Sequence, residues 1–374
     1  MFTVDRRFFL HLDWKLVGFI LALLFLGITT IFSVTDQWTR GEVPLYLKQM
    51  VWALAGMVVF VALSAFDYHR LLKAAAYIYW TAIILLGVVL AIGKVGMGAQ
   101  RWVQIGGLSL QPSELARLAV LLLLTRYLAD RVPAGGFRFR ELLIPGALAF
   151  IPAVMVLKQP DLGSALMILF LFGVMVLIAG IRPRSLISMV LATALILPFF
   201  WEFFWNSLHS YQRNRLVTFF DPEADPLGAG YHVMQSKIAI GAGGVVGQGF
   251  LQGSQSQLKF LPEGHTDFIF AVFAEQWGFL GVMVLLSLFA GLIWRGLDIA
   301  RRSRDIEGTL LAAAIVCMLT FYVFVNLGMT LGLMPVVGVP LPLMSYGGTA
   351  LVTNMAALGI LSNVHLQRHI SMYR

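Results

Sequence analysis

Three carboxylates stand at the starts of long apolar segments, where a membrane protein could carry out chemistry at the membrane surface. They are Glu114 in a Gln-Pro-Ser-Glu motif, Asp161 in Gln-Pro-Asp and Asp267 in His-Thr-Asp. Ionisable groups at the rim of a membrane helix are costly to desolvate, so each is a functional candidate by default. A carboxylate in such a place can accept a proton from a hydroxyl group and so act as a general base.

Two of these carboxylates also have a purely structural explanation. A proline near the first helical position followed by an acid suits the positive end of a helix, so Glu114 and Asp161 could each simply cap a helix. Asp267 instead precedes the apolar run 268–274, where desolvation would make its carboxylate a better proton acceptor. The alternative for Asp267 is a rim aspartate paired with Arg or Lys. We expect Glu275, deeper in the same segment, to form an interhelical hydrogen bond.

Several cationic side chains are expected at the same membrane face. They are Lys48, Arg101, Arg117, Lys158, Arg213 and Arg215. Arg117 follows Glu114 by three residues and so shares its helix face. Cations and helix N-termini together favour a diphosphate, although scattered interfacial Lys and Arg often contact only lipid head groups.

The composition identifies the class of protein that must position these groups. The 374 residues are 59% hydrophobic and 12% charged, with a mean hydropathy of +0.82, which excludes a soluble globular protein. The single cysteine, Cys317, excludes an intrachain disulfide. Basic residues give a net charge of +8 but are scattered between apolar segments, so nucleic acid is not an expected partner.

The apolar segments predict an all-α polytopic membrane protein with ten transmembrane helices. Their approximate ranges are 14–34, 44–66, 71–93, 112–129, 141–159, 162–181, 184–205, 266–294, 308–332 and 344–365. Seventeen of the 27 Lys and Arg residues fall on one side, which predicts that both termini are cytoplasmic. We expect the first helix to be an uncleaved anchor, and residues 206–265, between helices seven and eight, to form one large ordered extracytoplasmic cap with a helix near 231–237.

Two glycine-containing motifs and one histidine need separate interpretation. The run 241–249 is glycine-rich but lacks the lysine and the strand-to-helix context of a phosphate-binding loop. Residues 345–348, Ser-Tyr-Gly-Gly, could form a break that lines a substrate path or could only permit close helix packing. His265 has no second His or Cys at ligand spacing, so no metal site is predicted from it.

At this point six ordered motifs identify a resemblance. The chain resembles the SEDS family (shape, elongation, division and sporulation; FtsW/RodA/SpoVE) over nearly its whole length, as a single SEDS-type transmembrane domain of residues 1–374. The 226–232 run, Pro-Leu-Gly-Ala-Gly-Tyr-His, and the short tails are more similar to the elongation branch than to the division branch. The motifs lie at 99–102, 111–116, 159–163, 221–241, 260–270 and 340–348.

The resemblance implies a peptidoglycan glycosyltransferase of the bacterial inner membrane that polymerises lipid II at an active site facing the periplasm, with release of undecaprenyl diphosphate. The family's proposed catalytic aspartate falls on Asp267. Residues that line the family's central cavity fall on Arg101, Trp102, Glu114 and Asp161, with Arg117 where many relatives carry lysine. Together with Lys48, Arg215 and His265, these are the expected substrate-binding residues. Gln248 stands where relatives frequently carry lysine, which weakens any expectation that a cation is required there.

The resemblance also implies partners, and two other functions remain as alternatives. Expected partners are a class B penicillin-binding protein (PBP2) and other elongation proteins (MreC/MreD). No cofactor is certain, but a divalent cation held by Glu114 or Asp161 would help to neutralise the diphosphate. A lipid II flippase would also have many helices, although its site is expected at the midplane. A non-catalytic scaffold would leave the acidic and basic groups without a purpose.

Overall fold

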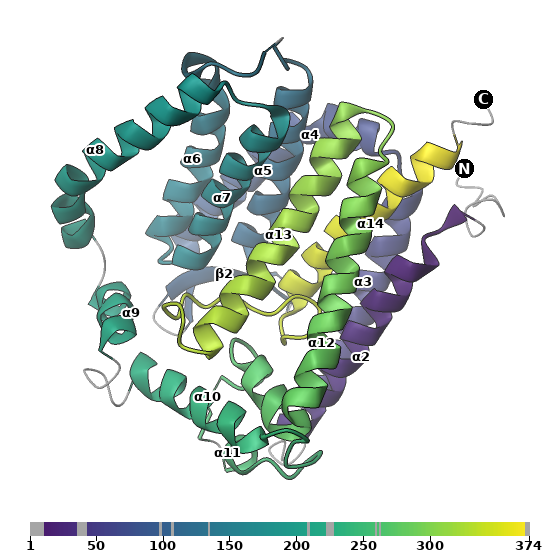
Figure 1. Ribbon diagram of the computed structural model, residues 1–374, viewed down its shortest axis with the longest axis vertical. Coiled ribbons are helices and arrows are strands. Elements are labelled where there is room, and N and C mark those ends of the chain that lie inside the picture. The colour runs from purple at the N-terminus through teal and green to yellow at the C-terminus, as the bar shows by residue number, and fades with distance from the viewer. Residues whose placement is uncertain are drawn as a thin grey trace. The chain divides into compact units, whose positions relative to one another are not determined.

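The computed structural model describes residues 11–35, 43–96, 99–105, 108–133, 135–207, 210–221, 228–258, 260–261 and 263–370 (Figure 1). Its elements are α2 (Trp14–Thr35), α3 (Leu45–Ala65), α4 (Tyr68–Ile92), β1 (Lys94–Gly96), β2 (Ala99–Ile105), β3 (Leu108–Leu110), α5 (Pro112–Ala129), η2 (Phe139–Leu142), α6 (Leu143–Lys158), α7 (Leu162–Ala179), α8 (Pro183–Ser207), α9 (Ser210–Phe220), α10 (Ala229–Gly243), α11 (Ser254–Gln257), α12 (Ile269–Arg301), α13 (Ile306–Thr330) and α14 (Gly348–Ile370).

The chain divides into two compact units, each made of segments that are separate in sequence. Unit 1 comprises Met1–Tyr68, Arg215–Arg304 and Met318–Arg374, and unit 2 comprises His69–Asn214 and Asp305–Cys317. Helix α13 contributes residues to both units. The interpretation of the chain as one SEDS-type domain stays a prediction.

The prediction of a helical membrane protein is confirmed. Among the described residues, eight helical segments are long and apolar enough to cross a membrane: Trp14–Thr35, Leu45–Ala65, Tyr68–Ala91, Phe139–Lys158, Leu162–Ala179, Ile269–Arg301, Ile306–Thr330 and Gly348–Arg368. The other two predicted spans are also helices. Helix α5 carries three charged residues, Glu114, Arg117 and Arg126, and the apolar part of α8 is only Pro183–Ile196.

A small antiparallel sheet lies between α4 and α5, where no strand was predicted. The strand order is β1-β2-β3, with Lys94 opposite Trp102 and Val103 opposite Leu110. The strands are three, seven and three residues long. The candidate residues Arg101 and Trp102 therefore lie on β2 rather than in an irregular loop.

In unit 1, helices α3 and α14 pack through small residues that let their backbones approach. A Cβ at Gly359 would lie 2.7 Å from the Phe60 carbonyl oxygen, so only glycine fits there. The Ser64 hydroxyl donates to the Gly359 carbonyl at 3.3 Å. Asn363 then donates to the Ser64 carbonyl at 2.7 Å and accepts from the Tyr68 N–H at 2.9 Å. These two side chains satisfy backbone groups of α14, of the end of α3 and of the start of α4 within an otherwise apolar contact.

Helix α12 lies beside α2 (Figure 1) and is interrupted within its length. Gly278 has φ 60° and ψ −163°, outside the helical region. Just before this break, the Gln276 side-chain amide donates to the Ser33 hydroxyl of α2 at 2.7 Å. Gln257 donates to the Ser33 carbonyl at 2.8 Å. The break is therefore tied to α2 through Gln276, and the segment before α12 is tied to the same residue of α2 through Gln257.

The expected cap, residues 206–265, contains α9, α10 and α11 among its described residues. The helix predicted near 231–237 is confirmed as α10. Val233 and Ala239 of α10 pack with Phe268, Val272 and other apolar side chains at the start of α12. The Ser236 hydroxyl also donates to the Thr330 carbonyl at the end of α13 at 2.8 Å. This packing supports the turn that precedes α12.

Candidate functional site

The turn before α12 carries Asp267, and its backbone is fixed by a residue from a distant helix. Asn326 of α13 donates from Nδ2 to the Asp267 carbonyl at 2.9 Å and to the Val339 carbonyl at 2.8 Å. The N-cap of α12 is Phe268, whose own side chain makes no capping hydrogen bond. Asp267 is half-buried. Asp267 therefore lies one residue before the N-cap of an apolar helix, with its backbone held in place by α13.

A second set of hydrogen bonds joins this turn to the loop before α14. The Ser345 hydroxyl donates to the Thr266 carbonyl at 2.7 Å, and the Tyr346 N–H donates to the His265 carbonyl at 2.9 Å. From α3, the Gln49 side chain donates to the Ser345 carbonyl at 3.1 Å. Helix α13 and the loop before α14 thus hold the backbone around Asp267 directly, and α3 holds that loop. Such preorganisation is what a catalytic group requires.

The carboxylate of Asp267 and the guanidinium of Arg215 approach the same point of the loop before α14. A Cβ at Gly338 would lie 3.4 Å from Asp267 Oδ2 and 3.7 Å from Arg215 Nη1. Gly338 has φ +72°, a conformation that other residues rarely adopt. Glycine therefore suits this position both by its backbone conformation and by leaving room beside an acid and a cation.

His265 lies two residues before Asp267 and is held in a partly apolar environment. Its ring centroid is 5.9 Å from that of Tyr346. Burial lowers the pKa of His265, with the charge of Glu263 opposing the shift, and burial raises the pKa of Tyr346. At neutral pH both rings are therefore uncharged. His265 can therefore supply a neutral hydrogen-bonding group from the same turn as Asp267.

In unit 2, Glu114 and Arg117 form an ion pair that is buried on all sides. Arg117 Nη1 donates to Glu114 Oε1 at 3.2 Å, and Nη2 lies 2.5 Å from Oε2. Arg117 is 0% exposed and Glu114 3%. Both belong to the first turns of α5, which begins with Pro112 at a first-turn position. The pairing on one helix face is confirmed, and the two-point geometry is the one that makes Arg–carboxylate contacts strong.

Asp161 is the N-cap of α7, so the structural interpretation of this residue is confirmed. Its carboxylate accepts from the Ser164 N–H at 3.2 Å and from the Ser164 hydroxyl at 2.8 Å. Ser113 and Gln111, at the start of α5, donate to it at 3.3 Å each. Asp161 therefore also joins α5 to α7. Glu114, by contrast, does not cap α5, whose N-cap is Gln111.

The remaining candidate residues lie on strand β2 and helix α3. Trp102 lies half-buried on β2. The side chain of Arg101, on the same strand, lies outside the described part of the chain. Lys48 is half-buried on α3, next to Gln49. The structure thus brings Asp267, Arg215 and His265 together in unit 1, and Glu114, Arg117 and Asp161 together in unit 2. Binding of substrate by any of these residues stays a prediction.

Comparison with known proteins gives the family. The family model for cell cycle proteins of the FtsW/RodA/SpoVE type matches residues 12–370. The chain belongs to this family. It is 42% identical over 359 residues to the peptidoglycan glycosyltransferase MrdB of Escherichia coli K12, with 96% of this chain and 94% of the relative covered. It is 33% identical to the peptidoglycan glycosyltransferase RodA of Treponema pallidum, covering 95% and 98%.

Solved structures of this family have the same fold. The rod shape determining protein RodA of Thermus thermophilus matches with a TM-score of 0.70 and 31% identity, covering 96% of this chain and 98% of that one. A chain from a peptidoglycan synthase complex, described as coordinating polymerization and crosslinking, matches with a TM-score of 0.81 and 34% identity, again covering 96% and 98%. Family membership and the apolar helices together make this FtsW/RodA/SpoVE protein a multi-pass membrane protein.

The glycine-rich run of this family member has a structural role that the sequence did not reveal. A Cβ at Gly243 would lie 2.1 Å from the Ala274 carbonyl oxygen, and one at Gly247 would lie 2.1 Å from the Gln276 carbonyl oxygen. The Gln248 N–H donates to the Glu275 carbonyl at 2.9 Å. The run therefore packs backbone to backbone against the break in α12. The unusual helix break at Gly278, rather than a phosphate, explains these glycines.

Glu275 is fully buried at the same break. Its carboxylate accepts hydrogen bonds from backbone N–H groups at the N-terminus of the short helix α11. Its Oε1 accepts from the Gln255 N–H at 2.7 Å and its Oε2 from the Ser256 N–H at 3.1 Å. A Cβ at Gly253 would lie 2.5 Å from Oε2, which leaves no room for a larger residue. The predicted interhelical hydrogen bond is confirmed, and its partner is the backbone of the cap rather than a membrane helix.

Proposed function

We propose that this protein is a peptidoglycan glycosyltransferase that polymerises lipid II during cell elongation. Its curated relatives MrdB and RodA are named peptidoglycan glycosyltransferases, at up to 42% identity over most of the chain. The observation that carries the proposal is the carboxylate of Asp267, half-buried at the start of α12 and sharing its approach to Gly338 with Arg215. An acid and a cation side by side suit a reaction in which a hydroxyl attacks a sugar and a diphosphate leaves.

The proposed reaction is a single displacement that inverts the anomeric carbon. The sugar of lipid II is α-linked to its diphosphate, whereas the polymer linkage is β. Asp267 takes the proton from the 4-hydroxyl of the acceptor GlcNAc as this oxygen bonds to C1 of the donor MurNAc. The bond between C1 and the diphosphate oxygen breaks, and its electron pair leaves on undecaprenyl diphosphate. General-base help of this kind contributes roughly 10²–10⁴-fold.

Stabilisation of the leaving diphosphate is the second requirement. We assign this role first to Arg215, because its guanidinium approaches the same glycine as the carboxylate of Asp267, and a guanidinium can contact two phosphate oxygens at once. Lys48, Arg101 and Arg117 are further candidates. Trp102, Glu114, Asp161 and His265 are proposed to bind the rest of the substrate.

The expected divalent cation at Glu114 or Asp161 has less support, because both carboxylates already have partners within the protein. Glu114 is paired with Arg117, and the Asp161 carboxylate accepts from three neighbouring side chains and one N–H. Within the described residues, no group of three His, Cys, Asp or Glu side chains could hold a metal ion. No step of the proposed reaction passes through a metal. Chelation with EDTA followed by addition of Mg²⁺ tests whether a cation contributes.

The proposed topology places this chemistry at the periplasmic face of the inner membrane. It has ten transmembrane helices, cytoplasmic termini and the single large extracytoplasmic cap of residues 206–265. Seventeen of 27 Lys and Arg residues on the cytoplasmic side support this orientation. A class B penicillin-binding protein (PBP2) is the proposed partner, supported by the fold match to a chain of a peptidoglycan synthase complex. MreC/MreD are further proposed partners.

The test is polymerisation of lipid II by the purified full-length protein in liposomes, with and without the penicillin-binding protein. Wild-type protein should lengthen glycan, and Asp267→Asn should remain folded but make none. Asp130→Asn is the matched control, because this exposed aspartate at the end of α5 undergoes the same chemical change away from the proposed chemistry. Full activity of Asp267→Asn would remove this residue from the reaction, and movement of lipid II across the bilayer without glycan would identify a flippase.

A further inference from the structure

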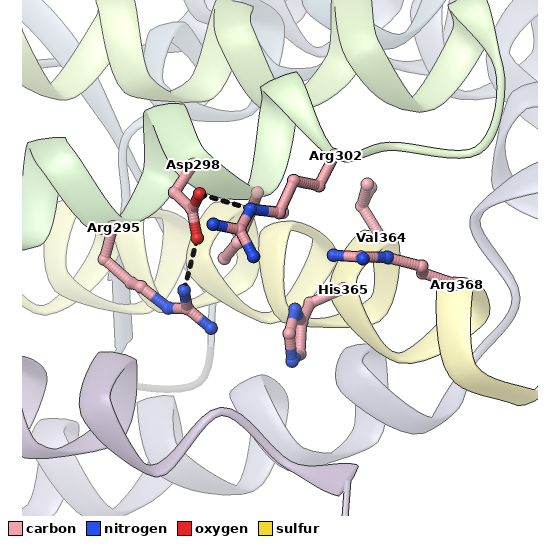
Figure 2. A pocket seen from close by; sticks show the side chains of 7 residues that line it. Arg295, Asp298, Arg302, Val364, His365 and Arg368 are labelled. Atoms are coloured by element: carbon pink, nitrogen blue, oxygen red, sulfur yellow. Dashed lines mark hydrogen bonds and ion pairs between the residues drawn. The ribbon is translucent and has the colours of Figure 1, made fainter.

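A pocket of about 260 Å³ lies at the C-terminal ends of α12 and α14, in unit 1 (Figure 2). Three arginines extend into it from these two helices, and Figure 2 shows their guanidinium groups pointing towards one another. The pocket is lined by Arg295, Asp298, Ile299, Arg302, Val364, His365 and Arg368. Helix α12 begins beside Asp267 and ends here, so the pocket lies at the opposite end of that helix from the proposed catalytic residue.

The ion pairs within the pocket leave cationic groups available. Asp298 accepts from Arg295 Nη1 at 2.5 Å and lies 2.6 Å from Arg302 Nε. Arg295 Nε also donates to Asp13 at 2.6 Å. The side chain of Arg302 is 60% exposed, and its contact with Asp298 is made through Nε. Arg368 has no ion pair or hydrogen bond within the described part of the chain. One lining carboxylate thus faces three lining guanidinium groups.

The surroundings indicate that the pocket lies at the level of lipid head groups. Trp294, which directly precedes Arg295, is 72% exposed, and Leu297 on the same helix is 40% exposed. Exposed tryptophans are typical of membrane–water interfaces. Ile299 and Val364 add aliphatic surface to the pocket itself. A ligand here would place an anionic group among arginines while its apolar part lies along the exposed face of α12.

We infer that this pocket binds the phosphate head group of an anionic membrane lipid. Basic pockets between membrane helices recognise such head groups, and planar guanidinium groups hold phosphate oxygens in pairs. Asp298 holds Arg295 and Arg302 in position, and Arg368 supplies a cation that no other described residue pairs with. Nothing in the proposed glycosyl transfer requires this site. The binding test below does not measure catalysis, so it stands or fails independently of the proposed function.

The test measures thermal stability of the purified full-length protein in a neutral detergent. The probes are phosphatidylglycerol, phosphatidylcholine and inorganic phosphate. Phosphatidylglycerol should raise the melting temperature and the other two should not, because a ligand that binds only the folded state stabilises it. In Arg368→Gln the apparent affinity for phosphatidylglycerol should fall by about 10- to 100-fold, the range for one charged hydrogen-bonding group.

Arg301→Gln is the matched control. Arg301 is exposed at the end of the same helix α12 and does not line the pocket, but its substitution removes the same charge. Equal loss in the two variants would mean general attraction to a charged surface and would overturn the inference. Stabilisation of the wild type by inorganic phosphate alone, or by phosphatidylcholine as much as by phosphatidylglycerol, would also overturn it. If Arg368→Gln fails to fold, Arg302→Gln takes its place with the same expected loss.

Discussion

The buried pair of Glu114 and Arg117 allows structural and functional roles to be separated by a double-mutant cycle. The variants are Glu114→Leu, Arg117→Met and the combination of both. Each single substitution leaves one ionic group inside unit 2 without its partner, at positions that are 3% or less exposed. Breaking a buried pair by removing one partner costs about 3–5 kcal/mol, whereas replacing both with apolar residues is often neutral or stabilising.

The structure also predicts which single variant is worse. The negative charge of Asp161 acts on both members of the pair, unfavourably on Glu114 and favourably on Arg117. Arg117→Met leaves two carboxylates close together, so its cost should lie at the upper end of this range. Glu114→Leu leaves Arg117 with the charge of Asp161 nearby, so its cost should lie at the lower end. The double variant should differ from the wild type by about 1 kcal/mol or less.

The assay is unfolding of the detergent-solubilised protein, followed by tryptophan fluorescence, together with glycan synthesis by each folded variant. A double variant that is stable but inactive would support substrate binding by the pair, whereas a stable and active one would leave the pair only a structural role. Single variants that each cost under about 1 kcal/mol, or that add without coupling, would show that the pair is not desolvated and would refute the reasoning.

Three further predictions concern the cap and the turn before α12. Glu275→Ala should lower the melting temperature, because each buried N–H of α11 left without its acceptor costs about 1–3 kcal/mol; Glu275→Gln, which keeps one acceptor oxygen, should cost less. Gly247→Ala should cost at least about 1–3 kcal/mol from backbone strain at φ +86°, whereas Gly241→Ala, with open space around it, should be neutral or stabilising in the same melting assay. Because burial lowers the pKa of His265 from 6.5, its neutral form is favoured in the fold, so stability is full above about pH 6.5 and falls as the pH drops below it. A plot of melting temperature against pH should therefore be flatter in acid for His265→Gln, and an unchanged slope would contradict this assignment.

Local sequence signals predicted the features that depend on neighbouring residues. The apolar runs gave the membrane helices, because burial of the backbone in lipid requires a helix wherever the side chains are apolar. The 231–237 stretch became α10, and the Gln-Pro-Asp motif gave the cap at Asp161. The pairing of Glu114 with Arg117 followed from their spacing of three residues.

Features that depend on distant segments could not be predicted in the same way. The sheet at 94–110 has strands of three to seven residues, too short for a pattern of alternating polarity to stand out. The break at Gly278 lies within a long apolar run and is stabilised from elsewhere, by the N–H and carbonyl groups of residues 244–249. Glycine at 243 and 247 was visible in the sequence, but the helix segment that these residues pack against, at the break in α12, was not.

The three carboxylates at helix starts show why a local motif cannot by itself assign a catalytic role. Asp161 caps its own helix, α7. Glu114 forms an ion pair with Arg117, one turn further along α5, so each of these carboxylates has a partner within a few residues. Asp267 differs because it lies one residue before the N-cap of α12, its backbone is held by Asn326 from α13, 59 residues further along the chain, and its carboxylate shares the approach to Gly338 with Arg215. A carboxylate that distant residues hold beside a cation is the one that we expect to act on a substrate, and the Asp267→Asn variant tests this expectation.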